Sequence, residues 1–154
     1  MPILLVRHAK AGSRQKWNGP DHLRPLSKKG WDQAFGLVGL LDEFAVTRVL
    51  SSPFLRCRQT VEPLAGQRKL TVEDHEALAE GAPLESSTGL VRDLAREPVV
   101  LCSHGDVIPE LLDALARTDG LSLPADYPYP KGSTWVLYAG RHGRFVKVAY
   151  LPPA

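Results

Sequence analysis

The chain has 154 residues, of which 44% are hydrophobic and 23% charged, and its formal net charge is +2. This composition is typical of a globular domain and excludes a disordered, collagen-like or disulfide-rich chain, so we expect a single domain over residues 1–154. Cys57 and Cys102 have no zinc-ligand spacing, and no apolar run is long enough to span a membrane, which favours a cytoplasmic protein without a structural zinc or a membrane anchor.

The first strand and the first helix follow from apolar periodicity. Residues 2–6 form a continuous apolar run, as in a strand covered on both faces, and the run ends at Arg7-His8. A helix is expected from Ser27, because Ser27 can cap the first turn and apolar residues recur at helical spacing as far as Leu41. A strand followed by a helix in this way is typical of a layered α/β domain.

A second strand and a second helix come next. Residues 48–51 predict a strand. The helix after it is expected to begin at Ser52-Pro53, with Ser52 at the cap and Pro53 at the first helical position, and to end or kink near Pro63. Arg56 then lies about one turn into this helix.

The second half of the chain continues the alternation and ends in a hairpin. Apolar residues between Ile108 and Leu115 fall on one face of a predicted helix. The other predicted elements are strands at 70–73 and 98–102, a helix at 83–95, and hairpin strands at 134–138 and 145–150. The whole pattern predicts an α/β fold, a three-layer sandwich with a mostly parallel central sheet, helices on both faces and a C-terminal hairpin.

Charged and nucleophilic side chains follow the predicted strands. Arg7 and His8 follow the first strand, Arg56 the second and His104 the fourth, and two glutamates follow the third. Ligands of open α/β sheets gather at the carboxyl ends of the strands, so we expect these side chains to converge on one crevice. Arginine binds phosphate oxygens and a neutral imidazole can attack phosphorus, so this set suits a phosphoryl group. Each of these residues taken alone is equally compatible with a structural role.

The loop after His8 is basic. The first thirty residues hold seven Lys or Arg and one acid, Asp21. Five residues of this loop are candidates to contact the rest of an anionic substrate: Lys10, Ser13, Arg14, Lys16 and Trp17. Gly105, beside the second histidine, is a further candidate, and the alternative for the loop is a solvated basic segment.

Four segments, in order along the chain, carry a resemblance to a known family. They are Leu4-Leu5-Val6-Arg7-His8-Ala9, Leu26-Ser27-Lys28-Lys29-Gly30-Trp31-Asp32-Gln33-Ala34, Ser51-Ser52-Pro53-Phe54-Leu55-Arg56-Cys57-Arg58-Gln59-Thr60 and Cys102-Ser103-His104-Gly105. Together they resemble the histidine phosphatase superfamily, also called the phosphoglycerate-mutase-like superfamily. Ala9 stands where most members have glycine, which resembles the small phosphohistidine phosphatases and the phosphatase domain fused to Nudix hydrolases in some bacteria. The Ala9 methyl is expected to narrow the room beside His8.

The resemblance implies a mechanism that needs no metal or other cofactor. His8 would attack phosphorus and become a phosphohistidine, which water would then hydrolyse. Arg7, Arg56 and His104 would hold the phosphate oxygens and stabilise the charge of the transition state.

The same resemblance implies a general acid after the third strand. Leu78-Ala79-Glu80 matches the family's Leu-x-Glu setting, so Glu80 is expected to protonate the leaving oxygen, with Glu76 as the alternative. Cys57 and Cys102 are expected to be small packing residues, because neither has a recognisable histidine partner.

Three functions fit these residues and the resemblance. The first is a metal-independent phosphatase that acts on phosphomonoesters or phosphohistidine; the others are a phosphomutase and a non-catalytic phosphate-binding or signalling module. Phosphoglycerate mutases are longer and carry extra segments that close over the site. The connection from Glu80 to the fourth strand is short in this chain, so hydrolysis is favoured. The expected partner is a phosphorylated small molecule or a phosphohistidine-bearing protein. Nucleic acid is not expected, because the basic residues cluster at one crevice and no aromatic residues interleave with them. A membrane is not expected, because no apolar run is long enough to span one.

Overall fold

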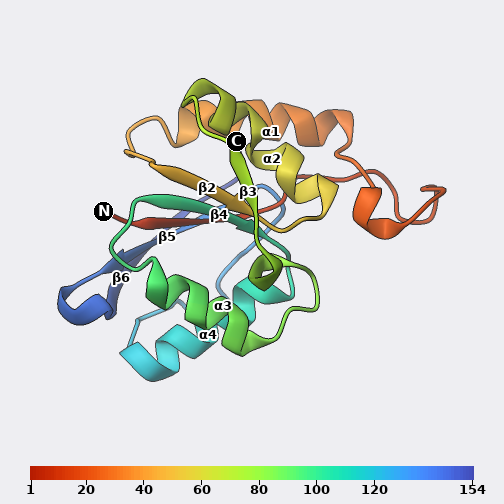
Figure 1. Ribbon diagram of the computed structural model, residues 1–154. Coiled ribbons are helices and arrows are strands. Elements are labelled where there is room, and N and C mark those ends of the chain that lie inside the picture. The colour runs from red at the N-terminus through yellow and green to blue at the C-terminus, as the bar shows by residue number, and fades with distance from the viewer.

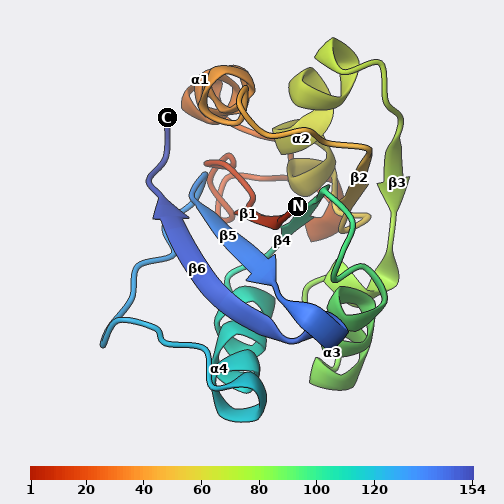
Figure 2. The same cartoon turned by 90° about the vertical axis from the view of Figure 1, so that its left-hand side faces the viewer.

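A six-stranded mixed sheet runs through the centre of the protein (Figure 1). The computed structural model describes residues 1–154, and the strand order is β3-β2-β4-β1-β5-β6. The strands are β1 (Ile3–Arg7), β2 (Arg48–Ser51), β3 (Val72–Asp74), β4 (Val99–Ser103), β5 (Thr134–Ala139) and β6 (Phe145–Leu151). Strands β3, β2, β4 and β1 pair in parallel, whereas β5 is antiparallel to both β1 and β6. The predicted C-terminal hairpin is therefore confirmed, and it lies at the edge of the sheet opposite β3 (Figure 2).

Two helices cover each face of this sheet. The helices are α1 (Lys28–Leu40), α2 (Leu55–Gln67), α3 (Leu84–Asp93) and α4 (Val107–Asp119). Helices α1 and α2 lie on one face and α3 and α4 on the other (Figure 1). Successive residues of β1 point into different apolar clusters: Leu4 and Val6 pack with residues of α1 and α2, whereas Ile3 and Leu5 pack with residues of α3 and α4. The three-layer α/β sandwich with a mostly parallel sheet is confirmed.

The start of α1 agrees with the sequence prediction. Ser27 Oγ accepts a hydrogen bond from the backbone N–H of Gly30 at 3.1 Å, which satisfies one free donor of the first turn. Gly30 also packs closely on the segment that follows β1, because a Cβ at this position would clash with the Lys10 carbonyl oxygen. The glycine therefore lets α1 begin directly against the chain that leaves the first strand.

The predicted start of α2 is wrong, and the helix does not end at Pro63. The helix begins at Leu55, so Ser52 and Pro53 precede it, and it continues through Pro63 as far as Gln67. A proline inside a helix costs about 3 kcal/mol relative to alanine. Side chains of α2 such as Val61 are fully buried, and each one contributes about 1.5–3 kcal/mol. Packing against the sheet therefore outweighs the local cost of the proline.

The other predicted boundaries are close to those observed. The third strand is shorter than predicted and is shifted toward Asp74, and α3 begins and ends inside the predicted range 83–95. The apolar face predicted for α4 is buried from Ile108 to Leu115. None of the four helices is long and apolar enough to cross a bilayer.

Candidate active site

Strands β1 and β4 carry His8 and His104 to the same edge of the sheet. The two strands are parallel neighbours with Arg7 opposite Ser103, so each histidine is the first residue after its strand. The backbone N–H of His8 donates to the Ser103 carbonyl at 3.0 Å. The centroids of the two imidazole rings are 5.4 Å apart, and the ring planes are inclined by 65°. The structure therefore brings together two side chains that are almost a hundred residues apart in the sequence.

The His8 ring is held as a neutral imidazole with one free nitrogen. Its Nδ1 lies 2.7 Å from the Ala9 carbonyl oxygen, and because a carbonyl only accepts, Nδ1 must carry the proton. Burial lowers the pKa of His8 to about 3, and the positive charges of Arg56 and Arg7 act in the same direction. At neutral pH the lone pair of Nε2 is therefore available for nucleophilic attack.

The buried neutral His8 should make the stability of the fold depend on pH. The His8 pKa is about 3 in the fold and returns to about 6.5 in the unfolded chain. Between these values only the unfolded chain binds the proton. His8 therefore lowers the free energy of unfolding as the pH falls below 6.5, by about 1.4 kcal/mol per pH unit. The free energies of unfolding of the wild type and of His8→Asn are to be measured in urea at pH 7 and pH 4.5. Between these pH values the wild type should lose about 2.5 kcal/mol more than His8→Asn does. An exposed control, His22→Asn, should show no such change, and a difference for His8→Asn that does not vary with pH would contradict the buried neutral ring.

Arg56 adjoins the histidine pair and is fully buried. Its Nη1 donates to the Asp21 backbone carbonyl at 3.0 Å, and its Nη2 donates to Asp21 Oδ2 at 3.1 Å and to Glu80 Oε1 at 3.2 Å. The Phe54 ring lies 5.0 Å from the guanidinium carbon. A buried cation requires partners of this kind, because removing one partner of a buried ion pair costs about 3–5 kcal/mol. The sequence showed Asp21 only as the single acid of a basic segment, and its contact with Arg56 depends on a tertiary position that no local pattern indicates.

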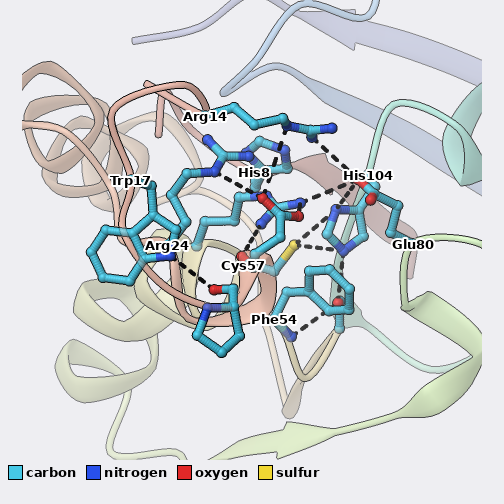
Figure 3. Close-up of polar contacts among 12 residues, drawn as sticks. His8, Arg14, Trp17, Arg24, Phe54, Cys57, Glu80 and His104 are labelled. Atoms are coloured by element: carbon cyan, nitrogen blue, oxygen red, sulfur yellow. Dashed lines mark hydrogen bonds and ion pairs between the residues drawn. The ribbon is translucent and has the colours of Figure 1, made fainter. Parts of the chain in front are cut away.

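The structure separates the two candidate glutamates. Glu80 Oε1 lies 3.2 Å from Arg56 Nη2 and 3.7 Å from His104 Nδ1 (Figure 3). Glu76 is in a 3-10 turn and lines a different cavity, beside α3. Of the two, Glu80 is the one that reaches the histidine pair.

A polar cavity of about 370 Å³ opens at this edge of the sheet. It is lined by Arg7, His8, Arg14, Arg24, Glu80, Gly105, Asp106 and Lys131. Six residues were predicted to contact the substrate. Arg14 and Gly105 line this cavity, whereas Lys10, Ser13, Lys16 and Trp17 do not. The lining holds four Arg or Lys and two acidic residues, so the cavity suits an anion.

Three residues of this lining were not found from the sequence. Arg24 is buried and donates through Nε to Asp21 Oδ1 at 3.0 Å. The pKa of Lys131 is lowered by burial and by the positive charges of neighbours such as Arg7. Lys131 is in a Pro- and Gly-rich loop without periodicity, so nothing in the sequence placed it here. Asp106 is only two positions after His104, so its place in the cavity could have been predicted from the sequence.

Gly105 makes room for Arg7. A Cβ at position 105 would lie 2.6 Å from Arg7 Nη2, so any side chain there would displace the guanidinium. Arg7 Nη1 donates to the Tyr129 carbonyl at 2.9 Å, while its Nε is buried and has no partner in the protein. An unpaired buried donor costs about 1–3 kcal/mol, and an oxygen of a bound anion would offset that cost.

The expectation for Ala9 is wrong. Its side chain is fully buried in a small cluster with Leu26 and Ala34, and it does not line the cavity. The methyl group therefore does not narrow the room beside His8. The backbone N–H of Ala9 donates to Thr60 Oγ1 at 2.9 Å, which helps to fix the peptide segment whose carbonyl holds the His8 ring.

The expectation that the cysteines have no histidine partner is wrong for Cys57. Its Sγ lies 3.5 Å from His104 Nε2, and the hydroxyl of Ser52 lies 2.8 Å from the same nitrogen. Cys57 and Ser52 thus fix the orientation of the His104 ring. Both come from the chain that leaves β2, so this contact depends on strand order and not on sequence spacing.

Two apposed imidazoles follow the parallel strands β1 and β4 and lie beside a cationic cavity. This arrangement suits a phosphoryl group. The chain belongs to the histidine phosphatase superfamily (branch 1), whose family model matches residues 3–83, more than half of the sequence.

Known proteins similar to this chain include phosphatases of several kinds. An 8-oxo-(d)GTP phosphatase of Mycolicibacterium smegmatis is 35% identical over 156 residues, which cover 98% of this chain and 48% of that protein. The chain therefore spans about half the length of this relative. The protein histidine phosphatase SixA complexed with tungstate has a TM-score of 0.77 at 20% identity, over 99% of this chain and 96% of its own. A mycobacterial glucosyl-3-phosphoglycerate phosphatase in complex with VO3 has a TM-score of 0.75 at 18% identity, over 97% and 96%. At these identities the two structures show a shared fold.

Proposed function

We propose that the protein is a phosphatase that hydrolyses phosphomonoesters or phosphohistidine through a covalent phosphohistidine on His8, without a metal. The observation that carries this proposal is the neutral His8 ring, whose Nδ1 is bound to the Ala9 carbonyl and whose Nε2 is free, in the lining of a cationic cavity. Fixed cations take the place that a metal ion has in many phosphoryl-transfer sites.

The first chemical step forms the phosphoenzyme. Nε2 of His8 attacks phosphorus in line, the bond from phosphorus to the leaving oxygen breaks, and that oxygen departs with the electron pair. Arg7, Arg56 and His104 stabilise the charge on the three remaining oxygens. Glu80, the carboxyl group that reaches the histidine pair, supplies the proton to the leaving oxygen.

The second step returns the free enzyme. Water attacks the phosphorus of the phosphohistidine, the P–N bond breaks, and its electron pair returns to Nε2. Glu80, now a carboxylate, accepts the proton of the attacking water. The products are inorganic phosphate and neutral His8.

The relatives support the substrate class as well as the reaction. One is a phosphatase of a nucleotide, one of protein histidine and one of a phosphoglycerate derivative, so the shared feature is a terminal phosphoryl group. The cavity contains no hydrophobic lining residue, which suits recognition of the phosphoryl group itself.

The phosphoenzyme provides the direct test. The protein mixed rapidly with acetyl phosphate or phosphoramidate and quenched in alkali should gain the mass of one phosphoryl group, and peptide mapping should place this group on His8. The adduct should be lost in acid, and turnover of both compounds should be unchanged by EDTA. An adduct on another residue, no adduct in the rapid quench, or turnover that requires an added metal would overturn the proposal.

A further inference from the structure

A second cavity, of about 220 Å³, adjoins the one that holds His8 and has no part in the steps above. It is lined by Gly12, Ser13, Lys16, Trp17, Arg24, Pro25 and Leu26. Arg24 lines both cavities. In Figure 3, Trp17 and His104 are on opposite sides of the view, with Arg24 and His8 between them. A substrate that reaches from one cavity into the other therefore passes Arg24.

Trp17 forms a fixed aromatic surface in this second cavity. The residue is 37% exposed, although its indole Nε1 donates to the Pro20 carbonyl at 2.8 Å. Gly19 lies against the same ring, because a Cβ at this position would be 3.4 Å from Cζ2 and 3.5 Å from Cε2 and Nε1. A ring that is already held in place loses little freedom when a flat aromatic group stacks on it.

The loop that carries Trp17 is tied down at its base. Ala11 and Leu26 form an antiparallel bridge, and the backbone N–H of Gly12 donates to the Pro25 carbonyl at 3.0 Å. Arg24 Nη1 also donates to the Gly12 carbonyl at 2.7 Å. The second cavity is therefore a preformed surface, which lowers the entropic cost of binding.

The two cavities hold more positive charge than one phosphoryl group requires. Arg14, Arg24 and Lys131 line the first cavity in addition to Arg7, and Lys16 lines the second. Lys131 has no carboxylate within ion-pair distance, as the ion pairs of the chain do not include it. Arg14 and Arg24 are ion-paired with Asp21, at 3.9 and 3.0 Å, whereas Lys131 is not paired. An unpaired cation such as Lys131 is free to bind a further phosphate oxygen.

We propose that the two cavities together bind a nucleoside diphosphate, with the terminal phosphoryl group at His8, the inner phosphate between Arg24 and Lys131, and the base stacked on Trp17. This inference rests on the proposed function, because it names the substrate class of the same site. The flat base matches the aromatic surface of Trp17, and the inner phosphate matches the extra cations. The terminal phosphate matches the nucleophile.

The reaction with this substrate balances without another reactant. His8 Nε2 bonds to the terminal phosphorus, and the bond from that phosphorus to the bridging oxygen breaks. The bridging oxygen keeps the electron pair and receives the proton from Glu80, which gives a nucleoside monophosphate. Water then releases inorganic phosphate from His8.

Kinetics with four compounds and two variants test the inference. The compounds are ADP, GDP, inorganic pyrophosphate and glycerol 3-phosphate. We expect the wild type to have a KM for ADP and GDP at least about tenfold below that for glycerol 3-phosphate. Trp17→Ala should raise the KM for ADP and GDP about tenfold, with kcat within about twofold, and should leave the constants for pyrophosphate and glycerol 3-phosphate unchanged. Phe35→Ala, which removes an exposed aromatic ring of α1, is the matched control and should change none of them.

Binding without turnover gives a second measurement. In His8→Asn, GDP should quench the tryptophan fluorescence, and the quenching should be lost when Trp17 is also replaced by phenylalanine. The inference is overturned if Trp17→Ala affects all four compounds equally or none, if GDP causes no quenching, or if phosphohistidine is the better substrate. Any of these results overturns the nucleoside diphosphate alone and does not affect the proposed function, provided that one of the compounds still forms the phosphoenzyme on His8. Only the absence of that adduct contradicts both the proposed function and this inference.

Discussion

Replacing His8 with asparagine should lower kcat by at least about 10³-fold for every substrate of this protein. The imidazole is the only group in the cavity that combines a free lone pair with burial beside fixed cations, and the transfer divides into two easier steps only if a covalent intermediate forms. Asparagine can still donate from its amide to the Ala9 carbonyl, so the change removes the nucleophile and little else. Steady-state hydrolysis of p-nitrophenyl phosphate measures the loss.

Phosphate binding separates loss of the nucleophile from loss of the site. Titration calorimetry with inorganic phosphate should give His8→Asn an affinity within a few-fold of the wild type, because Arg7 and Arg56 remain in place. His22→Asn, an exposed histidine on the loop beside the cavity, is the matched variant and should keep full activity. Activity of His8→Asn above about a tenth of the wild-type value would remove His8 from the proposed role.

Those parts of the site that depend on strand order could be predicted from the sequence. The continuous apolar runs that end at Arg7 and Ser103 identify buried parallel strands, and the residues after such strands meet at one edge. His8 and His104 therefore lie together for a reason that the sequence already contains. A continuous apolar strand must be covered on both faces, which predicted the three layers. In the structure Leu4 and Leu5 do face opposite apolar clusters.

Those parts that depend on loops could not be predicted. Asp21, Arg24 and Lys131 are outside the regular elements that carry periodicity. Asp21 reaches Arg56, and Arg24 and Lys131 reach the cavity, only through contacts across the fold. The course of α2 through Pro63 was likewise decided by burial, an effect of tertiary structure that overrides local propensity. Ser52 was expected to cap α2, and instead its hydroxyl contacts His104, because the first turn of α2 begins two residues later.

Asp21 links the loop at residues 10–24 to the catalytic edge of the sheet. Its carboxylate bonds to Arg24 through one oxygen and to Arg56 through the other, at 3.0 and 3.1 Å. The pKa of Asp21 is lowered, because hydrogen bonding and the nearby guanidinium charges outweigh its partial burial. The carboxylate therefore stays charged at neutral pH and holds together two arginines that would otherwise repel one another. The loop that carries Trp17 is fixed relative to the nucleophile by this contact.

Replacing Glu80 with glutamine should lower the rate of hydrolysis, and the loss should be larger for substrates with poorer leaving groups. Glutamine keeps a carbonyl oxygen for Arg56 but cannot give up a proton, so hydrolysis of an alkyl phosphate such as glycerol 3-phosphate should fall about 10²–10³-fold. p-Nitrophenolate departs readily as an anion, so hydrolysis of p-nitrophenyl phosphate should fall less than about tenfold for the first chemical step. Single-turnover rates with both compounds isolate that step from the release of phosphate.

Glu76→Gln is the matched control for this experiment, because Glu76 is in the same segment but lines another cavity. It should leave both rates unchanged. The two roles open to Glu80 predict different results. Loss of a general acid lowers the rate more for the poorer leaving group, whereas loss of a carboxylate that only positions Arg56 or His104 lowers the rates of both substrates alike. Equal losses for the two compounds would therefore assign Glu80 to positioning, and a leaving-group dependence in Glu76→Gln would transfer the acid to the other glutamate.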